Sequence, residues 1–177
     1  MKLEWMGNHR ALIEKIIKYG NAYSNTYKLQ RSYGTDVMFS ASQIQTLEYI
    51  LEAEDKDEKM SEMAARLGVS RSTFSKNVKN LEEKGLLEKY RLSGNRKDIY
   101  VKPSAEGREV YTKYTAFVRQ ICFDEIFQYA DKVSKADKDN FIRILDLLAD
   151  VLLWYGEKEQ VPRKLIKMDT IVDEIKE

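Results

Sequence analysis

Hydroxyl and cationic side chains between residues 70 and 79 are the ones in this sequence best placed to bind another molecule. Helical spacing, at about 100° per residue, puts one set of polar residues on a common face: Ser72, Lys76, Lys79 and Glu83. The opposite face carries Phe74, Val78 and Leu81, spaced i, i+4 and i+7. The pattern therefore predicts a helix that buries its apolar side and presents hydroxyl and ammonium groups outward.

A second, shorter helix is predicted just before this one. Ser61 is a candidate N-cap, and Met63, Ala64 and Leu67 form its inward side. Gly68 suits the left-handed residue that ends a helix, and Ser70 suits the cap of the next one. Two helices joined by such a tight turn form a helix-turn-helix.

A basic hairpin is predicted directly after the second helix. Gly85 ends that helix, residues 87–91 and 99–101 alternate as two short strands, and residues 93–95 form the turn before Pro103 stops the hairpin. The order helix, turn, helix and hairpin is typical of a winged helix-turn-helix. Such a helix fits the DNA major groove, while a cationic hairpin reaches phosphates or the minor groove.

Charge is unevenly distributed along the chain. Residues 66–102 hold ten basic and four acidic residues, a net charge of +6, while the whole chain carries only +1. The remainder is therefore at −5. This separation concentrates favourable potential for a polyanion on one module and indicates nucleic acid as its partner.

Long helices are expected on both sides of this module. They span residues 9–34, residues 40–54 with Ser40 as N-cap, residues 104 to about 130 with Ser104 as N-cap, and a last helix that starts at Ser134 or Asp137 and runs to Tyr155. The charged run of residues 55–59 is expected to be a surface loop. The first and last helices carry apolar surface too wide for one neighbour. We expect them to pair with the same helices of a second copy, although a larger internal core is the alternative.

Composition sets further limits. With 43% hydrophobic and 33% charged residues and only two prolines, the sequence predicts a mainly α protein with a small β wing, one domain over residues 1–177. One cysteine and no apolar run long enough for a bilayer predict a cytoplasmic protein without a membrane segment. We expect Cys122 to be inert and packed. A lone histidine, His9, far from that cysteine, argues against an enzyme, a metal site and a cofactor.

The segments 67–75 and 81–87, continued by residues 95–97 and 104–107, resemble the MarR family of bacterial transcriptional regulators. The resemblance extends over residues 9–155. It implies a DNA-binding core at 40–103, dimerisation helices at 8–34 and 104–156, and a C-terminal extension at 157–177. It also implies a homodimeric, ligand-responsive repressor on a pseudo-palindromic operator. A winged helix used only for protein contacts is the alternative.

Candidate contacts to double-stranded DNA follow from this arrangement. Near the start of the second helix, Ser72, Thr73 and Lys76 are expected to reach base edges. Phosphates are expected to be held by Ser70, Arg71, Ser75 and Lys79. The wing is expected to contribute Arg91, Asn95, Arg96 and Lys97. Family members usually carry Asp-x-Arg at the wing tip, where this chain has Asn95 and Lys97, so the wing contact falls to Arg96 or to Lys97.

The same resemblance implies a small aromatic effector in a cleft between the dimerisation helices and the core. Six aromatic residues are candidates to line it: Tyr19, Tyr23, Tyr27, Tyr111, Tyr114 and Phe117. Stripes of this kind also serve as plain core or dimer packing, and both interpretations are open at this point.

Overall fold

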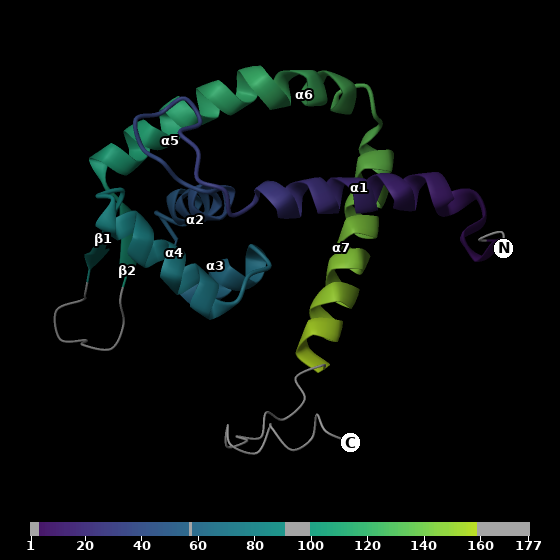
Figure 1. The fold of residues 1–177 in the computed structure, drawn as a ribbon, viewed down its shortest axis with the longest axis horizontal. Helices are drawn as coiled ribbons and strands as arrows, with labels where there is room; N and C mark the ends of the chain where they lie inside the picture. The colour runs from purple at the N-terminus through teal and green to yellow at the C-terminus, as the bar shows by residue number, and fades with distance from the viewer. Residues whose placement is uncertain (1–3, 57, 91–99, 159–177) are drawn as a thin grey trace, which may run out of the picture. The chain divides into compact units, whose positions relative to one another are not determined.

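The computed structural model describes residues 4–56, 58–90 and 100–158, which are mostly helical and include one two-stranded sheet (Figure 1). The chain divides into two compact units, Met1–Ile126 and Phe127–Glu177. The predicted fold class, mainly α with a small β wing, is confirmed. The helix-turn-helix and the strands lie in the first unit.

The first unit follows the predicted order of elements. After a 3-10 turn at Glu4–His9 come α1 (Arg10–Thr26), α2 (Ala41–Glu52), α3 (Met60–Arg66), α4 (Arg71–Glu83), β1 (Leu87–Tyr90), β2 (Tyr100–Pro103) and α5 (Ala105–Val118). β1 pairs antiparallel with β2, from Leu87 opposite Pro103 to Tyr90 opposite Tyr100.

The core of this unit lies between α2 and α4. Its largest fully buried apolar side chains are Phe39, Phe74, Ile44, Leu47, Ile50, Leu81, Leu86 and Val78. Burying each of these stabilises the fold by roughly 1.5–3 kcal/mol relative to an exposed position. The inward stripe predicted for α4 is thereby confirmed, and it fixes the opposite face of α4 toward solvent.

Serine caps begin three helices of the first unit as the sequence predicts. Ser40 Oγ accepts from Gln43 N, and Gln43 Oε1 accepts from Ser40 N at 3.0 Å. Ser70 and Ser104 accept from the backbone N–H groups of Thr73 and Gly107 in the same way. Each such cap satisfies a helix N–H group that otherwise has no partner inside the helix.

The predicted cap of α3 is wrong. The helix begins at Met60, two residues earlier than a cap at Ser61 implies, and Lys59 is its N-cap residue. Glu62 Oε2 accepts from Lys59 N at 2.9 Å. This carboxylate satisfies the N–H group of the cap residue itself, as in the reciprocal half of a capping box, and Ser61 lies inside the helix.

The first helix is shorter than predicted, because α1 ends at Thr26 and not at Gly34. Arg31 and Phe39 instead pair through their backbones at 2.9 and 3.0 Å. Tyr33, at φ 46°, packs its ring on Phe39 at 5.5 Å between centroids. These contacts outweigh helix propensity here, since a continuous helix would carry Tyr33 away from the core.

β2 runs through Pro103, two residues beyond the predicted strand end. Proline is tolerated at the end of a strand because it lacks only an N–H donor. Ser104 N then donates to Leu86 O at 3.1 Å and extends the contact between the two segments.

Helical structure continues from α5 through a π turn at Arg119–Phe123 into α6 (Asp124–Ala130). The prediction of one helix reaching Ala130 therefore holds apart from this turn. Cys122 lies in the turn and is exposed, so its predicted packing is wrong for the single chain. Ile121 beside it is 62% exposed, because this part of the helix runs past the core.

The second unit contains α7 (Lys135–Lys158). Ser134 Oγ accepts from Asp137 N at 3.1 Å, which confirms Ser134 as the cap of the two candidates. Large apolar side chains of α7 are 40% exposed or more: Phe141, Ile142, Leu145, Leu147, Val151, Leu152, Leu153 and Trp154. Within the described residues, no helix combines the length and the apolar character that a bilayer span requires.

Candidate nucleic-acid interface

The outward face of α4 is polar and cationic over its whole first half. Arg71, Ser72, Thr73, Ser75 and Lys76 are all exposed. Phe74 and Asn77 lie on the opposite face of the helix and are buried. The core thus holds the helix in one rotational setting, and five predicted contact residues lie on the surface together.

A cluster of hydroxyl groups lies at the N-terminus of α4. Ser70 Oγ accepts from Thr73 N at 3.1 Å and lies 2.9 Å from both Ser72 Oγ and Thr73 Oγ1. Helix N-termini carry partial positive charge and favour anions. Ser70 also caps the helix, so a phosphate at this end would meet a hydroxyl group that is already oriented.

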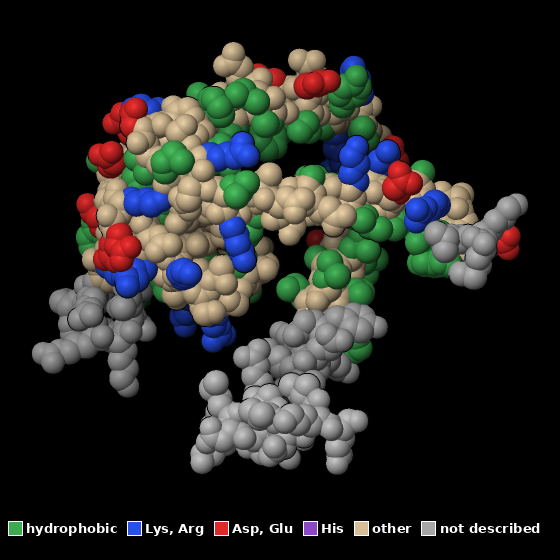
Figure 2. Space-filling view, in the orientation of Figure 1, with side chains coloured by type: hydrophobic (Ala, Val, Ile, Leu, Met, Phe, Trp, Pro, Cys, Tyr) green, Lys and Arg blue, Asp and Glu red, His purple; other side chains and the backbone are tan. Residues whose placement is uncertain are grey.

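Two cations on this face have no counter-ion in the part of the chain that the structure describes. Among the described residues, neither Arg71 nor Lys76 makes an ion pair, while Lys79 lies 3.7 Å from Glu83. Figure 2 shows Lys and Arg side chains along the lower edge of the first unit, over α3 and α4. Arg71 and Lys76 therefore offer the least compensated positive charge of α4 to an anionic partner.

Two further cations of the +6 segment, Arg66 and Lys89, are paired with carboxylates. Arg66 binds Glu52 at 2.8 Å and Glu58 at 3.3 Å, and Lys89 pairs with Glu82. These pairs neutralise charge locally. The sequence count therefore overstates the positive charge that is free on the exposed face of α4.

Lys84 lies at the end of α4 and turns toward the loop before α2. It donates to the backbone carbonyl of Met38, and its ammonium lies 3.3 Å from both Gln30 Oε1 and Gln43 Oε1. Burial lowers the pKa of Lys84 below its ordinary value, because desolvation disfavours the charged form. This residue is a structural cation that holds the C-terminus of α4.

Asn77 is the positioning residue that sequence reasoning missed. Its amide nitrogen lies 2.8 Å from Ser42 Oγ, 3.1 Å from Ser42 O and 3.0 Å from Thr46 Oγ1, all on α2. The signal was present in the sequence, since an amide at the centre of the Phe74, Val78 and Leu81 stripe must find partners when buried.

The predicted wing residues Arg91, Asn95, Arg96 and Lys97 lie outside the described residues. The strands that lead to them are described, and Lys89 and Lys102 there are exposed. The wing contacts stay a prediction.

The candidate effector residues are brought together only in part. Tyr19 stacks on Tyr23 along α1, and Tyr23 contacts Tyr27, the residue that caps the end of this helix, at 5.1 Å between centroids. On α5, Tyr114 packs edge-on against Tyr33 and Phe39 at 5.8 Å. Phe117 fills the space beside Gly34, where a Cβ would lie 2.7 Å from its ring.

Three of these tyrosines have a raised pKa. Burial raises the pKa of Tyr23, although its hydrogen bond with Gln45 acts in the opposite direction. Burial raises the pKa of Tyr114 to about 12, with the charge of Glu48 as a second cause. Burial and the hydrogen bond to Glu48 also raise the pKa of Tyr111. All three hydroxyls stay neutral near neutral pH, and the tyrosine cleft stays a prediction.

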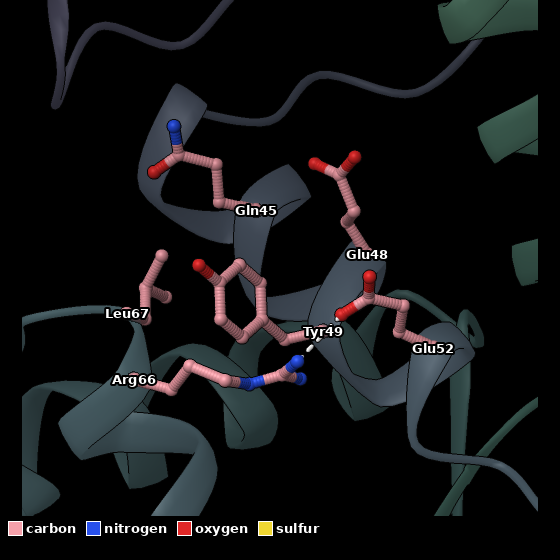
Figure 3. Close-up of a pocket in the computed structure, with 6 residues that line it drawn as sticks. All are labelled: Gln45, Glu48, Tyr49, Glu52, Arg66 and Leu67. Carbon is pink, nitrogen blue, oxygen red and sulfur yellow. Dashed lines mark hydrogen bonds and ion pairs between the residues drawn. The ribbon is translucent and has the colours of Figure 1, made fainter. Parts of the chain in front are cut away.

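A pocket of about 440 Å³ lies elsewhere, between α2 and α3 (Figure 3). Its lining residues are Gln45, Glu48, Tyr49, Glu52, Arg66 and Leu67, none of which belongs to the predicted cleft. In the part of the chain that the structure describes, no group of three or more His, Cys, Asp or Glu is arranged to hold a metal ion.

The family model that matches this chain is that of the MarR family, over residues 39–98. Residues 39–98 are therefore similar to the MarR family model. The matched segment begins at the buried Phe39 and includes α2, α3, α4 and β1, so it contains the exposed face of α4. No protein of curated function matches the sequence.

Solved structures of MarR-family proteins share the fold. ZitR of Lactococcus lactis, solved in complex with DNA, is 13% identical, with a TM-score of 0.58 over 83% of this chain and 99% of its own. PcaV of Streptomyces coelicolor, solved with its natural ligand, is 16% identical, with a TM-score of 0.55 over 85% and 97%. MosR of M. tuberculosis is 23% identical, with a TM-score of 0.52 over 82% and 96%. At these identities the likeness shows a shared fold and nothing more.

Proposed function

We propose that this protein is a sequence-specific DNA-binding transcriptional regulator, without enzymatic activity, in which α4 enters the major groove. The observation that carries the proposal is the exposed first half of α4, where Arg71 and Lys76 lack a counter-ion among the described residues while Phe74 and Asn77 fix the helix from behind. ZitR, which shares the fold, was solved with DNA.

Two copies are proposed to bind together. Apolar side chains on α7 remain exposed, and Leu152 at 74% is the most exposed of them. On α1, Ile17 is 52% exposed and Tyr19 is 69% exposed. Surface of this kind suits a two-fold symmetric interface, in which the same patch meets itself. A homodimer would place two α4 helices in successive major grooves of a pseudo-palindrome.

Repression under ligand control is proposed as the mode of action. PcaV, of similar fold, was solved with a natural ligand. A ligand that favours one spacing of the two α4 helices would change DNA affinity, because both helices must fit their grooves at once. A bound repressor blocks transcription until the ligand releases it.

Selection of duplexes from a random pool tests the proposal. Fluorescence anisotropy across salt concentrations then compares the full chain with Arg71→Ala and Lys76→Ala. Both substitutions are expected to weaken binding. Arg71→Ala, at a predicted phosphate contact, is expected to reduce the slope of log affinity against log salt by about 1, while Lys76→Ala, at a predicted base contact, is expected to cost about 1–3 kcal/mol on the selected duplex. Lys18→Ala, an exposed lysine on α1, is the matched control and leaves the slope unchanged.

Two outcomes would contradict the proposal. If no selected duplex binds more tightly than a scrambled one at moderate salt, DNA readout is refuted. That result favours the alternative, in which the cationic face of α4 meets an acidic protein. If Arg71→Ala leaves the slope unchanged and Lys76→Ala leaves the affinity unchanged, α4 does not contact DNA.

A further inference from the structure

The pocket between α2 and α3 is acidic at its rim and aromatic at its centre. Glu48 and Glu52 supply carboxylates, Tyr49 supplies a ring, and Leu67 adds an apolar wall. Its volume of about 440 Å³ is within the range of small-molecule sites, roughly 300–1,000 Å³. The residues that line it come from two elements of the same compact unit.

The Tyr49 ring already holds a cation. The guanidinium of Arg66 lies over it, 4.5 Å from the ring centroid, and Arg66 is held there by Glu52 at 2.8 Å. The face of an aromatic ring carries negative electrostatic potential, which attracts cations. In Figure 3 the ring lies between Arg66 on one side and Gln45 and Glu48 on the other.

Glu48 is the carboxylate without a cation. It is half-buried, and Tyr111 Oη donates to its Oε1 atom at 2.8 Å. Among the described residues, Glu48 forms no ion pair and its Oε2 atom accepts no hydrogen bond. A partly desolvated negative charge with only a neutral partner is attractive for a positive ligand.

The acidic wall of the pocket is held in place from outside. Tyr111 on α5 orients Glu48, and the amide of Gln45 donates to Tyr23 Oη on α1 at 2.6 Å. Both side chains are therefore fixed before a ligand arrives, which reduces the entropy lost on binding. The charge of Glu48 also contributes to the raised pKa of Tyr111.

The net charge around the pocket favours a positively charged ligand. Glu48, Glu52 and Glu58 contribute three negative charges, and Arg66, which pairs with the last two, contributes one positive charge. The neighbourhood is therefore at −2. Phenolates and carboxylates are disfavoured there, and a monovalent cation with apolar groups fits the carboxylate, the ring and the apolar wall together.

We propose that this pocket binds an organic cation, a quaternary or protonated amine with apolar substituents, between the Glu48 carboxylate and the Tyr49 ring. Neither the dimer nor the DNA complex is required for this site, so its test is independent of the proposed regulation.

Isothermal titration calorimetry of the full chain at constant ionic strength is the test. Benzyltrimethylammonium is the probe, with benzyl alcohol as the neutral and salicylate as the anionic comparison. The cation is expected to bind more tightly than both. Glu48→Gln is expected to weaken cation binding roughly tenfold, which corresponds to about 1.4 kcal/mol for one lost charge interaction. Glu14→Gln, the same change at an exposed position on α1, stays within about twofold of the wild type.

A second variant keeps the proposal testable if the first one does not fold. If circular dichroism shows that Glu48→Gln does not fold, Tyr49→Leu carries the test, and its cation binding falls several-fold because the ring is lost. The proposal is overturned if the wild type does not bind the cation, if salicylate binds as tightly, or if the folded variant binds the cation like the wild type.

Discussion

Asn77 on α4 is joined to Ser42 on α2 by a buried side-chain hydrogen bond of 2.8 Å. Thr46 Oγ1 lies 3.0 Å from the same amide nitrogen. Both partners belong to α2, one turn apart, so the contact fixes both the rotation of α4 and its position along α2. An apolar residue at position 77 would leave both the rotation of α4 and its position along α2 less tightly fixed, because hydrophobic contact has no direction.

Replacing this amide is expected to destabilise the fold. Asn77→Ala leaves the hydroxyl oxygens of Ser42 and Thr46 without this donor and is expected to lower the free energy of unfolding by about 1–3 kcal/mol. Asn80→Ala, on the same helix but half-exposed, is the control and changes the free energy of unfolding by less than about 0.5 kcal/mol. Urea denaturation of both variants measures the difference. Equal effects would show that the Asn77 amide does not anchor α4.

Substitution by alanine is expected to lower the free energy of unfolding at Gly107 and to raise it at Gly20. A Cβ at Gly107 would lie 2.1 Å from Leu86 O, so Gly107→Ala forces α5 away from the segment before β1. We expect a loss of roughly 1–3 kcal/mol or more in the free energy of unfolding. Gly20, in α1, has no atom within 4 Å of such a Cβ, and Gly20→Ala is expected to gain about 0.5–1 kcal/mol. Thermal denaturation distinguishes the two signs, and a loss at Gly20 would contradict its open surroundings.

The raised pKa of Tyr114 predicts a loss of stability at high pH. Burial raises this pKa to about 12, while an unfolded chain titrates near 10. The folded state therefore retains the proton longer, and stability present below about pH 10 is lost as the pH rises toward 12.

Tyr114→Phe removes the titrating group from this comparison. Relative to the variant, the wild type is expected to lose free energy of unfolding between about pH 10 and about pH 11.5, with a constant difference between about pH 7 and about pH 8.5. Chemical denaturation at these pH values measures both. A difference that stays constant above pH 10 would contradict the buried setting of Tyr114.

The proposed dimer predicts sensitivity at the most exposed apolar position of α7. Leu152→Asp places a carboxylate in the interface and is expected to shift the sedimenting species from dimer to monomer, because an unpaired buried charge is costly. Asp150→Asn, an exposed residue on the same helix, is the control and leaves the mass unchanged. Sedimentation equilibrium gives the mass directly. A monomeric wild type, or a dimeric Leu152→Asp variant, would remove α7 from the interface.

Local signals predicted much of the fold. Ser40, Ser70 and Ser104 begin their helices because a cap is a contact across three residues. The period of Phe74, Val78 and Leu81 settled which face of α4 is buried. The exposure of Arg71 and Lys76 follows from the same period, so the candidate DNA-binding face of α4 was available from the sequence.

Contacts between distant residues decided the rest. Tyr33 leaves the helical pattern because it packs on Phe39 and Tyr114, and the second of these lies 81 positions further along the chain. Arg66 and Lys84 count as cations in the sequence, yet each turns to partners outside the basic segment and adds nothing to the exposed face of α4. The pocket beside Glu48 exists only where α2 meets α3. The sequence by itself determined which residues of the helix-turn-helix face outward, through short-range periodicity and capping. Only the tertiary structure decided which charges stay free and where a cavity forms, because both depend on partners that chain position does not specify.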